Sequence, residues 1–427
     1  MEGTIYSGGT KLINMRIFLL TLLLSFGPFC EAAFSYSLEN DLRTLLFTTN
    51  TYNRFTRPLS QVNITAELNL LTLTSLSIKD QTMAIAGYFT FEWTDNRLSW
   101  SSNALYNSDI PAFYTTQDYV WIPSLAVTNS ISDIAVISDN TFIIRVSKEG
   151  TLKWTPGGIY ETQCTTDVTY YPFDIQTCAV TLTTWGYTNI EIALMGSGVE
   201  LTYYEPNGEW DFASYSMSSS TRTHGRNSLP QISFNLTFRR RPAFQIMNTI
   251  IPMILLASLS CFVFQLPPDS GEKMGYSLTT LLAFAVYLTL VSANIPTTSI
   301  NTATLSVYLI IMLAMGVISV LLTIYVLKCH HSPEERPIPN YLRKFCFLAT
   351  KIAFIDACCK QKVYSIDEPE IESKTKELPK SHVEEPELTW PAVTRILDKF
   401  FFRFYALFLF VVTFCVLLTL IIYHYTK

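Results

Sequence analysis

The sequence is short of charge. Only 15% of its 427 residues are charged, whereas 49% are hydrophobic, and the mean hydropathy is +0.24. This balance is too apolar for an ordinary soluble protein and too polar for a chain that lies wholly in lipid. It predicts one soluble domain followed by a few membrane spans. The formal net charge of −5 gives no reason to expect nucleic-acid binding.

Catalytic and metal-binding groups are equally sparse. Cys358 and Cys359 are adjacent but have no further cluster of metal ligands around them. Acylation or metal binding there stays open, and ordinary reduced thiols are the simpler interpretation. No nucleophile or acidic partner is arranged around the five histidines, which are His224, His330, His331, His382 and His424. We therefore expect no enzyme, no cofactor and no metal site.

Charge is missing altogether from long runs in the second half of the chain. Residues 242–268 are uncharged, which is enough for a helix across about 30 Å of hydrocarbon. Residues 274–327 are also uncharged but too long for one span. The polar segment 294–302 divides them, so we expect two helices joined by a short exposed turn. A fourth span is expected over 404–423.

The flanks of these runs predict the topology. The first hydrophobic run, residues 17–26, follows Lys11 and Arg16 and is too short to span, which is typical of a signal peptide cleaved near Ala32. An uncleaved anchor is the alternative. Basic residues after the third span place that side in the cytosol, and these are Lys328, Arg336, Arg343, Lys344 and Lys351. A multi-pass plasma-membrane protein with both termini extracellular is expected.

Together these signals divide the chain into five parts. They are a signal peptide at 1–32, an extracellular β-sandwich at 33–241, three spans at 242–328, an intracellular segment at 329–398 and the fourth span at 399–427. Inside the intracellular segment, residues 361–388 are rich in Glu, Lys, Pro and Ser and are predicted to be disordered. Pro391 then begins a helix that leads into the fourth span.

The extracellular part carries a short helix and then many strands. Residues 34–60 open with leucines at helical spacing, and from Val62 the hydrophobic period changes to two. Further strand-like runs lie around residues 83–93, 142–146, 179–184 and 232–238. This pattern predicts an antiparallel β-sandwich, so the fold class is an α+β membrane protein in which the sandwich precedes a four-helix bundle. Glycosylation sequons begin at Asn63 and Asn235.

Two of the nine cysteines are left in the secreted portion. Cys164 and Cys178 must either pair or stay free, because the others fall in the signal peptide, the spans or the cytosolic side. In an oxidising compartment the pair is expected to close. A loop of this size stabilises a fold by about 3 kcal/mol through chain entropy.

The second span has an unusual face. Residues at alternating steps of three and four are polar, small or lightly apolar, and they are Glu272, Gly275, Thr279, Leu282, Val286, Thr289 and Ala293. We interpret this stripe as lining water. The opposite face, with Met274, Leu278, Leu281, Ala285 and Leu288, is expected to pack against protein. The alternative is a helix buried in a bundle whose threonines bond to their own backbone.

Several motifs resemble one known family. The segment CTTDVTYYPFDIQTC, residues 164–178, is similar to the signature loop of the Cys-loop pentameric ligand-gated ion channels. The resemblance extends to YFTFEWTDNRLSW, WIP, GTLKWTPGGIY and RRRP in the first half, and to GEK and HHSPEERPIPNYLRKF around the spans. It covers residues 38–423 apart from the acidic linker. The GEK motif and the run after the third span resemble the nicotinic acetylcholine receptor branch.

This resemblance implies a homo- or hetero-pentamer in which the second span lines the pore. Membrane lipids and permeant cations would be its further partners, with a small extracellular ligand bound between neighbouring sandwiches. A ring of Glu272 would attract cations at the cytoplasmic mouth, while Lys273 would point away from the pore. Thr279 would replace part of an ion's hydration shell, and Leu282 with Val286 would form an apolar constriction that dewets when closed.

The resemblance also implies how ligand binding reaches the pore. The loop that ends at Asp174 would contact the turn at 297–299 next to Pro296, and Asp174 would pair with Arg240. Such a pair is costly to break from one side, about 3–5 kcal/mol, which suits a structural pivot. Ile78 stands where many relatives have an acid, with Asp80 close by, so the coupling at this position departs from the family pattern.

The ligand site departs furthest from the family. Nicotinic relatives hold a quaternary ammonium among aromatic rings, each worth about 0.5–2 kcal/mol. Trp185 matches the central tryptophan, but Tyr88 replaces a tryptophan, and Thr128 and Leu229 fall where tyrosines are expected. The adjacent cysteines of the capping loop are absent. The remaining candidates for this site are Thr90, Arg145, Arg222 and His224.

Two hypotheses follow for the ligand, and two rivals for the function. The first hypothesis is that the ligand is anionic or zwitterionic instead of a choline ester. The second is that the chain is a complementary subunit of a hetero-pentamer and supplies only half of a ligand site. A cation-selective channel subunit is the expected function. A non-conducting subunit and an anion channel of the same fold are the rivals, and the anion channel is disfavoured by Glu272 and the absence of a Pro-Ala-Arg run.

Overall fold

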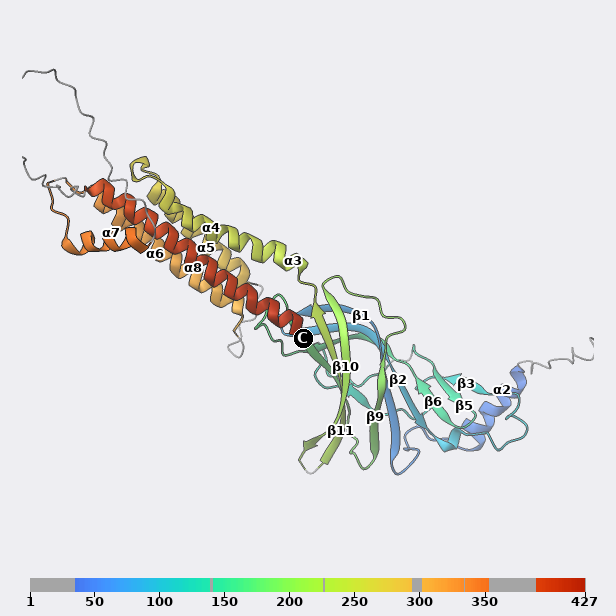
Figure 1. Ribbon diagram of the computed structural model, residues 1–427. Helices are drawn as coiled ribbons and strands as arrows, with labels where there is room; N and C mark the ends of the chain where they lie inside the picture. The colour runs from blue at the N-terminus through green and yellow to red at the C-terminus, as the bar shows by residue number, and fades with distance from the viewer. Residues whose placement is uncertain are drawn as a thin grey trace, which may run out of the picture.

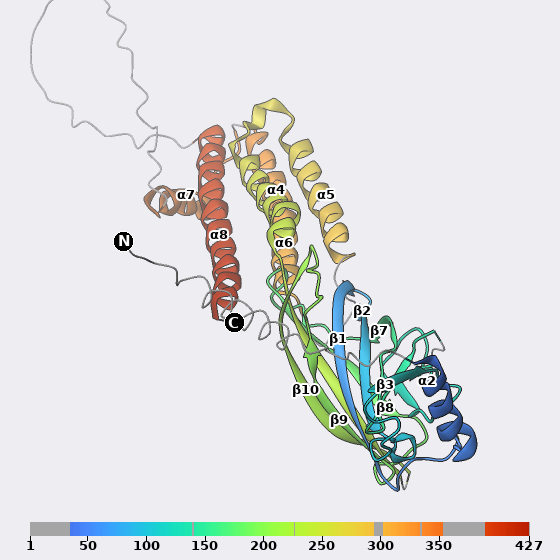
Figure 2. The ribbon, with the colours of Figure 1, turned by 90° about the vertical axis from the view of Figure 1, so that its right-hand side faces the viewer.

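The computed structural model of the chain is elongated, with strands gathered at one end and helices at the other (Figures 1 and 2). It describes residues 35–138, 141–225, 227–293, 302–333, 335–352 and 389–426. The expected signal peptide, the turn containing Pro296, and the linker with Cys358 and Cys359 lie outside the described residues.

The predicted sandwich is confirmed as two sheets, with the difference that one pair of strands, residues 62–69 and 192–200, runs parallel. The first sheet has seven strands in the order β3-β5-β6-β2-β1-β9, with β7 paired to β2. Its strands are β1 (Val62–Ser77), β2 (Thr82–Thr94), β3 (Ala112–Thr115), β5 (Ile144–Ser147), β6 (Thr151–Trp154), β7 (Gly157–Gln163) and β9 (Ile192–Glu200). The second sheet has the order β10-β11-β8-β4, from β4 (Leu125–Val127), β8 (Ile175–Thr184), β10 (Trp210–His224) and β11 (Asn227–Arg240).

The core lies between the two sheets and follows the period-two pattern of the sequence. In β11 every second residue from Pro230 to Arg240 is buried, because successive side chains of a strand point to opposite faces. Aromatic rings fill the interior: Phe89 lies 5.4 Å from Phe91 and 5.9 Å from Phe234 between ring centroids. The helix expected near the start is also present, as α2 (Tyr36–Arg43) followed by a wider turn to Thr49.

Among the described residues, four helices are long and apolar enough to cross a membrane. They are Ala243–Gln265, which contains α3 (Ala243–Gln245) and α4 (Ile251–Phe262), then α5 (Lys273–Ser292), α6 (Thr304–His330) and the long α8 (Trp390–Thr426). As predicted, the helix that begins beside Pro391 runs without a break into the fourth span. The described end of α8 lies against the sandwich (Figure 1).

One helix was not predicted. The helix α7 (Asn340–Ile352) packs against the start of α8 and buries Leu342, Cys346 and Ala349. Their spacing of four and three residues is the signal of an amphipathic helix that the sequence already carried.

Candidate functional site

All seven residues of the predicted stripe on α5 and at its ends are exposed in the single chain. Leu282 is 64% exposed and Val286 53% exposed, as are apolar side chains on the outer faces of the other spans, such as Leu407 at 64%. The hydroxyls of Thr279 and Thr289 donate to the carbonyls of Tyr276 and Val286 at 2.9 and 2.7 Å. Each hydroxyl thereby uses its one hydrogen, and its oxygen keeps lone pairs that can accept.

The packed face of α5 differs from the expectation. Leu278, assigned to the packed face, is 47% exposed within the chain. The buried residues are instead Lys273, Ser277, Phe284 and Val291, which share the face directly opposite the stripe. The sequence assignment was correct only in part. Met274, Leu281, Ala285 and Leu288 are half-buried, and Leu288 packs against the main core, but the fully buried side chains lie further round the helix.

That ion pair joins α5 to α8. Lys273 is 0% exposed, and its ammonium donates to Asp398 Oδ1 at 2.5 Å. The two residues are 125 positions apart in the sequence. Lys273 therefore points away from the stripe, as the resemblance implies, and its charge is matched inside the bundle. Glu272, its neighbour, stays exposed at the start of α5.

A second buried ion pair lies where the sandwich meets the helices. Arg240, at the end of β11, donates from Nε to Asp174 Oδ1 at 2.8 Å and from Nη2 to Oδ2 at 3.5 Å. The guanidinium also contacts Glu209 and lies 4.1 Å from the ring centroid of Trp210. The amide of Gln176 donates to Asp174 Oδ2 at 2.7 Å. This carboxylate thus accepts from three donors, two of which belong to the charged guanidinium.

The same junction holds an open cavity of about 510 Å³. Ile78, Asp80, Arg240 and Tyr287 are among its lining residues, so the β1–β2 loop and two helices border one space. Ile78 is buried, and Asp80 accepts from the hydroxyl of Ser77 at 2.7 Å. Among the ion pairs of the described residues none includes Asp80. Because Ile78 is apolar where many relatives have an acid, the carboxylates that pair with Arg240 at this junction are those of Asp174 and Glu209.

Two contacts at the junction had no counterpart in the sequence reasoning. The carbonyl of Thr169, in the loop 164–178, accepts from both the amide and the hydroxyl of Thr304 at 3.0 and 2.7 Å. The ring of Tyr170 stacks on Tyr423 with centroids 3.8 Å apart. The loop thus holds the first turn of α6 and the last turns of α8. The Cys164–Cys178 disulfide closes this loop, as predicted.

The ligand-site candidates fall on two separate sheets. Trp185, Thr128, Leu229 and Arg222 belong to or adjoin the second sheet, where Leu229 is paired with Arg222 in the β10–β11 register. Trp185 is 52% exposed. The side chain of His224 lies outside the described residues.

The remaining candidates belong to the first sheet. Tyr88 on β2 is half-buried and Arg145 on β5 is exposed. Within the described part of the chain, no hydrogen bond or ring contact joins them to the group on the second sheet. Thr90 is only 6% exposed, and its hydroxyl accepts from the amide of Asn69 at 3.0 Å. Because its own chain covers it, we leave Thr90 out of the proposed site.

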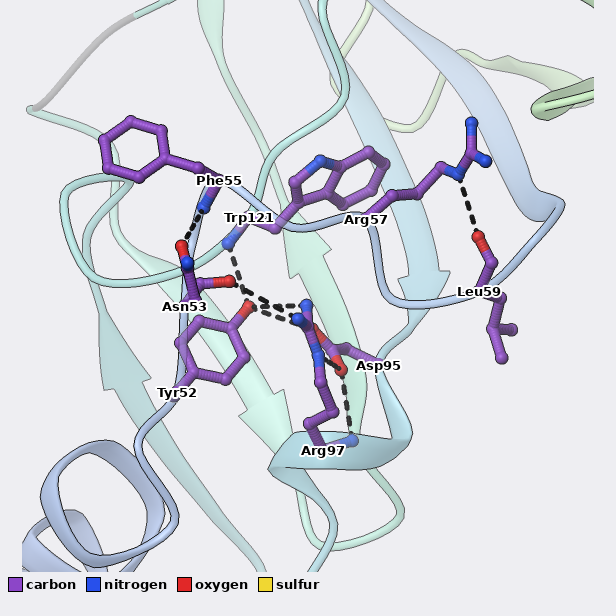
Figure 3. A network of polar contacts seen from close by, with 8 residues as sticks. All are labelled: Tyr52, Asn53, Phe55, Arg57, Leu59, Asp95, Arg97 and Trp121. Carbon is purple, nitrogen blue, oxygen red and sulfur yellow. Dashed lines mark hydrogen bonds and ion pairs between the residues drawn. The ribbon is translucent and has the colours of Figure 1, made fainter.

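A buried polar network joins Tyr52, Asp95 and Arg97 to Trp121 (Figure 3). Asp95 is 0% exposed and accepts from Arg97 Nε at 2.9 Å and Nη2 at 2.7 Å, which raises the pKa of Arg97. The hydroxyl of Tyr52 donates to Asp95 at 2.9 Å and accepts from the amide of Trp121 at 3.0 Å.

This network fixes the WIP segment from which β4 continues. The carbonyl of Ser124, one residue before β4, accepts from the amide of Trp185 at 2.7 Å. The network therefore holds the chain segment whose carbonyl at Ser124 binds the backbone amide of Trp185. In the sequence, Asp95 stands near the end of YFTFEWTDN, a run that also contains Glu92.

Two family models match the chain, one for each part of this architecture. The neurotransmitter-gated ion-channel ligand binding domain matches residues 39–242, and the neurotransmitter-gated ion-channel transmembrane region matches residues 249–362. The chain belongs to the neurotransmitter-gated ion channels, a family of ligand-gated channels and not of enzymes.

Within this family the chain is similar to nicotinic acetylcholine receptor subunits. It is 31% identical over 338 residues to the acetylcholine receptor subunit beta of Rattus norvegicus, covering 74% of this chain and 66% of the relative. It is 30% identical over 347 residues to the neuronal acetylcholine receptor subunit beta-4 of Mus musculus, covering 80% and 68%. The beta-2 subunit of Carassius auratus is 31% identical over 311 residues, covering 71% and 67%. The chain spans about two thirds of the length of these relatives.

Proposed function

We propose that this chain is a subunit of a cation-selective pentameric channel in which α5 lines the pore. The observation that carries the proposal is the continuous exposed stripe from Glu272 to Ala293, with threonine oxygens left free to accept. Five such stripes around an axis enclose a path lined by hydroxyl, carboxylate and small side chains. In a lipid-facing helix, the exposed carboxylate of Glu272 would find no partner.

Cation selectivity is supported by the charges at the start of α5. Glu272 is exposed there, and the adjacent positive charge of Lys273 is buried against Asp398. A ring of Glu272 carboxylates lowers the energy of a cation at the mouth and raises that of an anion. Leu282 and Val286, further along the stripe, form the proposed apolar constriction of the closed state.

The opening ligand is a small extracellular molecule bound between subunits, with Trp185 from one sheet and Tyr88 from the next subunit facing it. The relatives are named as acetylcholine receptors, but this chain offers fewer aromatic rings at the matching positions. Arg222 and Arg145 are exposed, so we propose an anionic or zwitterionic ligand. A micromolar response to acetylcholine or choline would refute this assignment.

The pore assignment is tested with a pair of cysteine substitutions. Thr279 and Thr280 both donate to the carbonyl of Tyr276 at 2.9 Å, but Thr279 is exposed while Thr280 is half-buried. In full-length channels on the cell surface, a charged water-soluble thiol reagent should block the current of Thr279→Cys and spare Thr280→Cys. An unreactive cysteine at 279 in an active, correctly assembled receptor would overturn the pore assignment.

Selectivity is tested by diluting the external NaCl during ligand-gated current. A cation channel shifts its reversal potential toward negative voltages, by up to about 59 mV for a tenfold dilution. Glu272→Ala should reduce that shift of the reversal potential. Asp269→Ala removes an exposed acid just before α5 and should leave most of the shift unchanged. A shift toward positive voltages identifies an anion channel.

The complementary-subunit hypothesis has its own test. Robust ligand-gated current from this chain expressed alone excludes that hypothesis.

A further inference from the structure

One edge of the β-sandwich differs from the others. The edge strands β3 and β4 have only four and three residues. The edge strand β9 contains glycines at 196 and 198 and a register shift in its pairing with β1. In contrast, β10 has 15 residues and pairs only with β11 in the described part of the chain. A long open strand edge is a template on which another chain can add a strand.

The edge of β10 lacks the usual protection against such pairing, which is a charge, a proline, a bulge or a cover. From Phe212 to Thr221 the strand has no charged residue and no proline, and its register shift lies at its start, between residues 212 and 214. Every residue over 213–223 is exposed. Tyr215 and Met217 are 43% and 40% exposed. The edge therefore presents apolar side chains as well as backbone groups.

The outer face of the second sheet is uncharged beside this edge. Ser216, Asn235 and Ala179 are directly paired on β10, β11 and β8, so their side chains lie next to one another on one face. The surrounding side chains of this face are short and carry hydroxyls: Ser214, Ser218, Ser233, Thr237, Thr177 and Thr181. Pairs of these hydroxyls lie 3.1 Å apart across β8 and β11. A surface of this kind suits a neutral molecule rich in hydroxyl groups.

Asn235 stands in the middle of this face. It begins the triplet Asn235-Leu-Thr, which is an acceptor sequence for N-linked glycosylation. Its side chain is half-buried, and Nδ2 donates to Ser216 Oγ at 3.4 Å. The opposite neighbour, Ala179, carries only a methyl group. Because both neighbours are small, the space beside the amide is open to a first sugar.

We propose that Asn235 carries an N-linked oligosaccharide that covers the outer face of the second sheet and protects the free edge of β10. In the transfer, the bond between the anomeric carbon of the first sugar and the diphosphate of its lipid carrier breaks. That carbon then forms a bond with Asn235 Nδ2, which releases one proton. Neighbouring strands lie about 4.8 Å apart, so a branched oligosaccharide on β11 extends past β10. A bulky hydrated sugar at this edge leaves no room for an incoming strand.

The proposal rests on the proposed topology, because this transfer takes place only in the lumen of the secretory pathway. It does not depend on the ligand or on ion conduction. The sequon at Asn63 provides an internal reference. Asn63 is exposed on β1, which is paired with β2 on one side and β9 on the other, so a sugar there covers no free edge.

The first measurement is the occupancy of the two sequons. Full-length protein is made in cultured animal cells and purified in mild detergent. Treatment with peptide N-glycosidase in heavy-oxygen water labels each modified asparagine for mass spectrometry of peptides. Asn235 should be modified. Sugar at Asn63 without sugar at Asn235 would overturn the proposal and leave the topology intact, whereas sugar at neither would overturn the proposal together with the topology.

The second measurement asks what the sugar does. In size-exclusion chromatography, Asn235→Gln should lose much of the pentamer peak to larger species, while Asn63→Gln should match the wild-type protein. Amide hydrogen exchange in the larger species should be slowed over residues 212–221, because an added strand pairs with these backbone groups. An unchanged pentamer peak, or slowed exchange in other segments only, would contradict the protective role.

A charge on the edge should replace the sugar. Asn235→Gln/Ser218→Lys places a lysine on β10 and should restore the pentamer peak, because charged side chains disfavour strand addition. Asn235→Gln/Thr94→Lys is the matched control. It adds the same charge at an exposed residue of β2, which is paired with β1 and β6, and it should stay aggregated. Equal recovery in both variants would mean that only net charge matters, and the role of β10 would be lost.

A further arm of the experiment avoids any effect of the substitution on folding. Wild-type protein made with high-mannose sugars is trimmed after folding by endoglycosidase H, which leaves a single sugar unit at each site. The trimmed protein should form the same larger species as Asn235→Gln. The trimmed Asn63→Gln variant should do so as well, since its sugar at Asn235 is also cut. Trimmed proteins that stay pentameric would refute the cover.

Discussion

The two ends of the helical bundle each contain a buried ion pair, but the two pairs are built differently. At the sandwich end, Arg240 meets Asp174 through two nitrogens and gains Glu209 and the ring of Trp210 as further partners. At the opposite end, the single ammonium of Lys273 meets one oxygen of Asp398. Burial makes both pairs expensive to break from one side.

The difference reflects what each side chain offers. A guanidinium is planar and presents five donors in a fixed fork, so it can connect several segments at once. An ammonium is a compact charge that matches one carboxylate. The sandwich end must hold β11, the loop 164–178 and the segment before β10 together, whereas the other end only joins α5 to α8. We therefore call the first pair the junction, because it connects three segments, and the second pair the clamp, because it joins only α5 to α8.

Removing the guanidinium of the junction should have the largest effect. Arg240→Gln leaves the carboxylate of Asp174 buried without its counter-charge and should destabilise the assembly by about 3–5 kcal/mol. Thermal melting of pentamers, followed by size-exclusion chromatography, measures the loss. Arg241→Gln is the matched control, because Arg241 is 46% exposed and pairs with the exposed Asp211. Equal losses in the two variants would contradict the junction.

Breaking the clamp should cost less and should be repairable. Lys273→Met leaves Asp398 unpaired and should destabilise the protein by up to about 3 kcal/mol, since a single contact is lost. Adding Asp398→Leu should restore most of the melting temperature, because an apolar pair of similar volume can replace a buried ion pair. Lys328→Met, at an exposed position on α6, provides the control. A double variant as unstable as the single one would show that the pair is not the cause.

The smallest effect is expected at the exposed pair beside the junction. Arg241 donates to Asp211 from Nε at 2.9 Å, and this hydrogen bond lowers the pKa of Asp211 below its ordinary value of 3.8. A carboxyl whose pKa is lower in the folded state stabilises above its unfolded pKa, and this contribution disappears as the pH falls through the folded pKa. Arg241→Gln should therefore lower the melting temperature near pH 7 by less than either of the other variants, because solvent screens an exposed ion pair.

At pH values below the pKa of Asp211 the variant and the wild-type protein should melt together. Melting curves of both proteins between neutral and acidic pH give the comparison. A difference that grows on acidification would contradict the assignment of this pair.

Much of the architecture could be predicted from local sequence patterns. The period of two after Val62 and the uncharged runs after Pro242 predicted the sandwich and the spans, because strand alternation and membrane partition depend on neighbouring residues. The stripe of α5 was also visible, since seven side chains at helical spacing define a face. The helix α7 was missed although its apolar residues follow the same rule, because the run is short and rich in basic residues.

The contacts between distant segments could not be predicted in this way. Nothing local indicates that Lys273 meets Asp398, that Thr304 bonds to Thr169, or that Tyr52 links Asp95 to Trp121. Each of these depends on the packing of elements that lie tens of residues apart. The packed face of α5 was misassigned in part for the same reason, because it begins with a lysine whose partner belongs to another helix.

The sequence by itself determined the strand character of the extracellular part, with β1, β2, β5, β8 and β11 located, the four spans, and the face of α5 that carries hydroxyls and a carboxylate. It did so because hydrophobic period and run length act over a few neighbouring residues. Only the tertiary structure decided which charges are matched and which stay free: Lys273 is neutralised, whereas Glu272 is not. Pairing is a property of distance in space, and a chain brings its ion pairs together only when it folds.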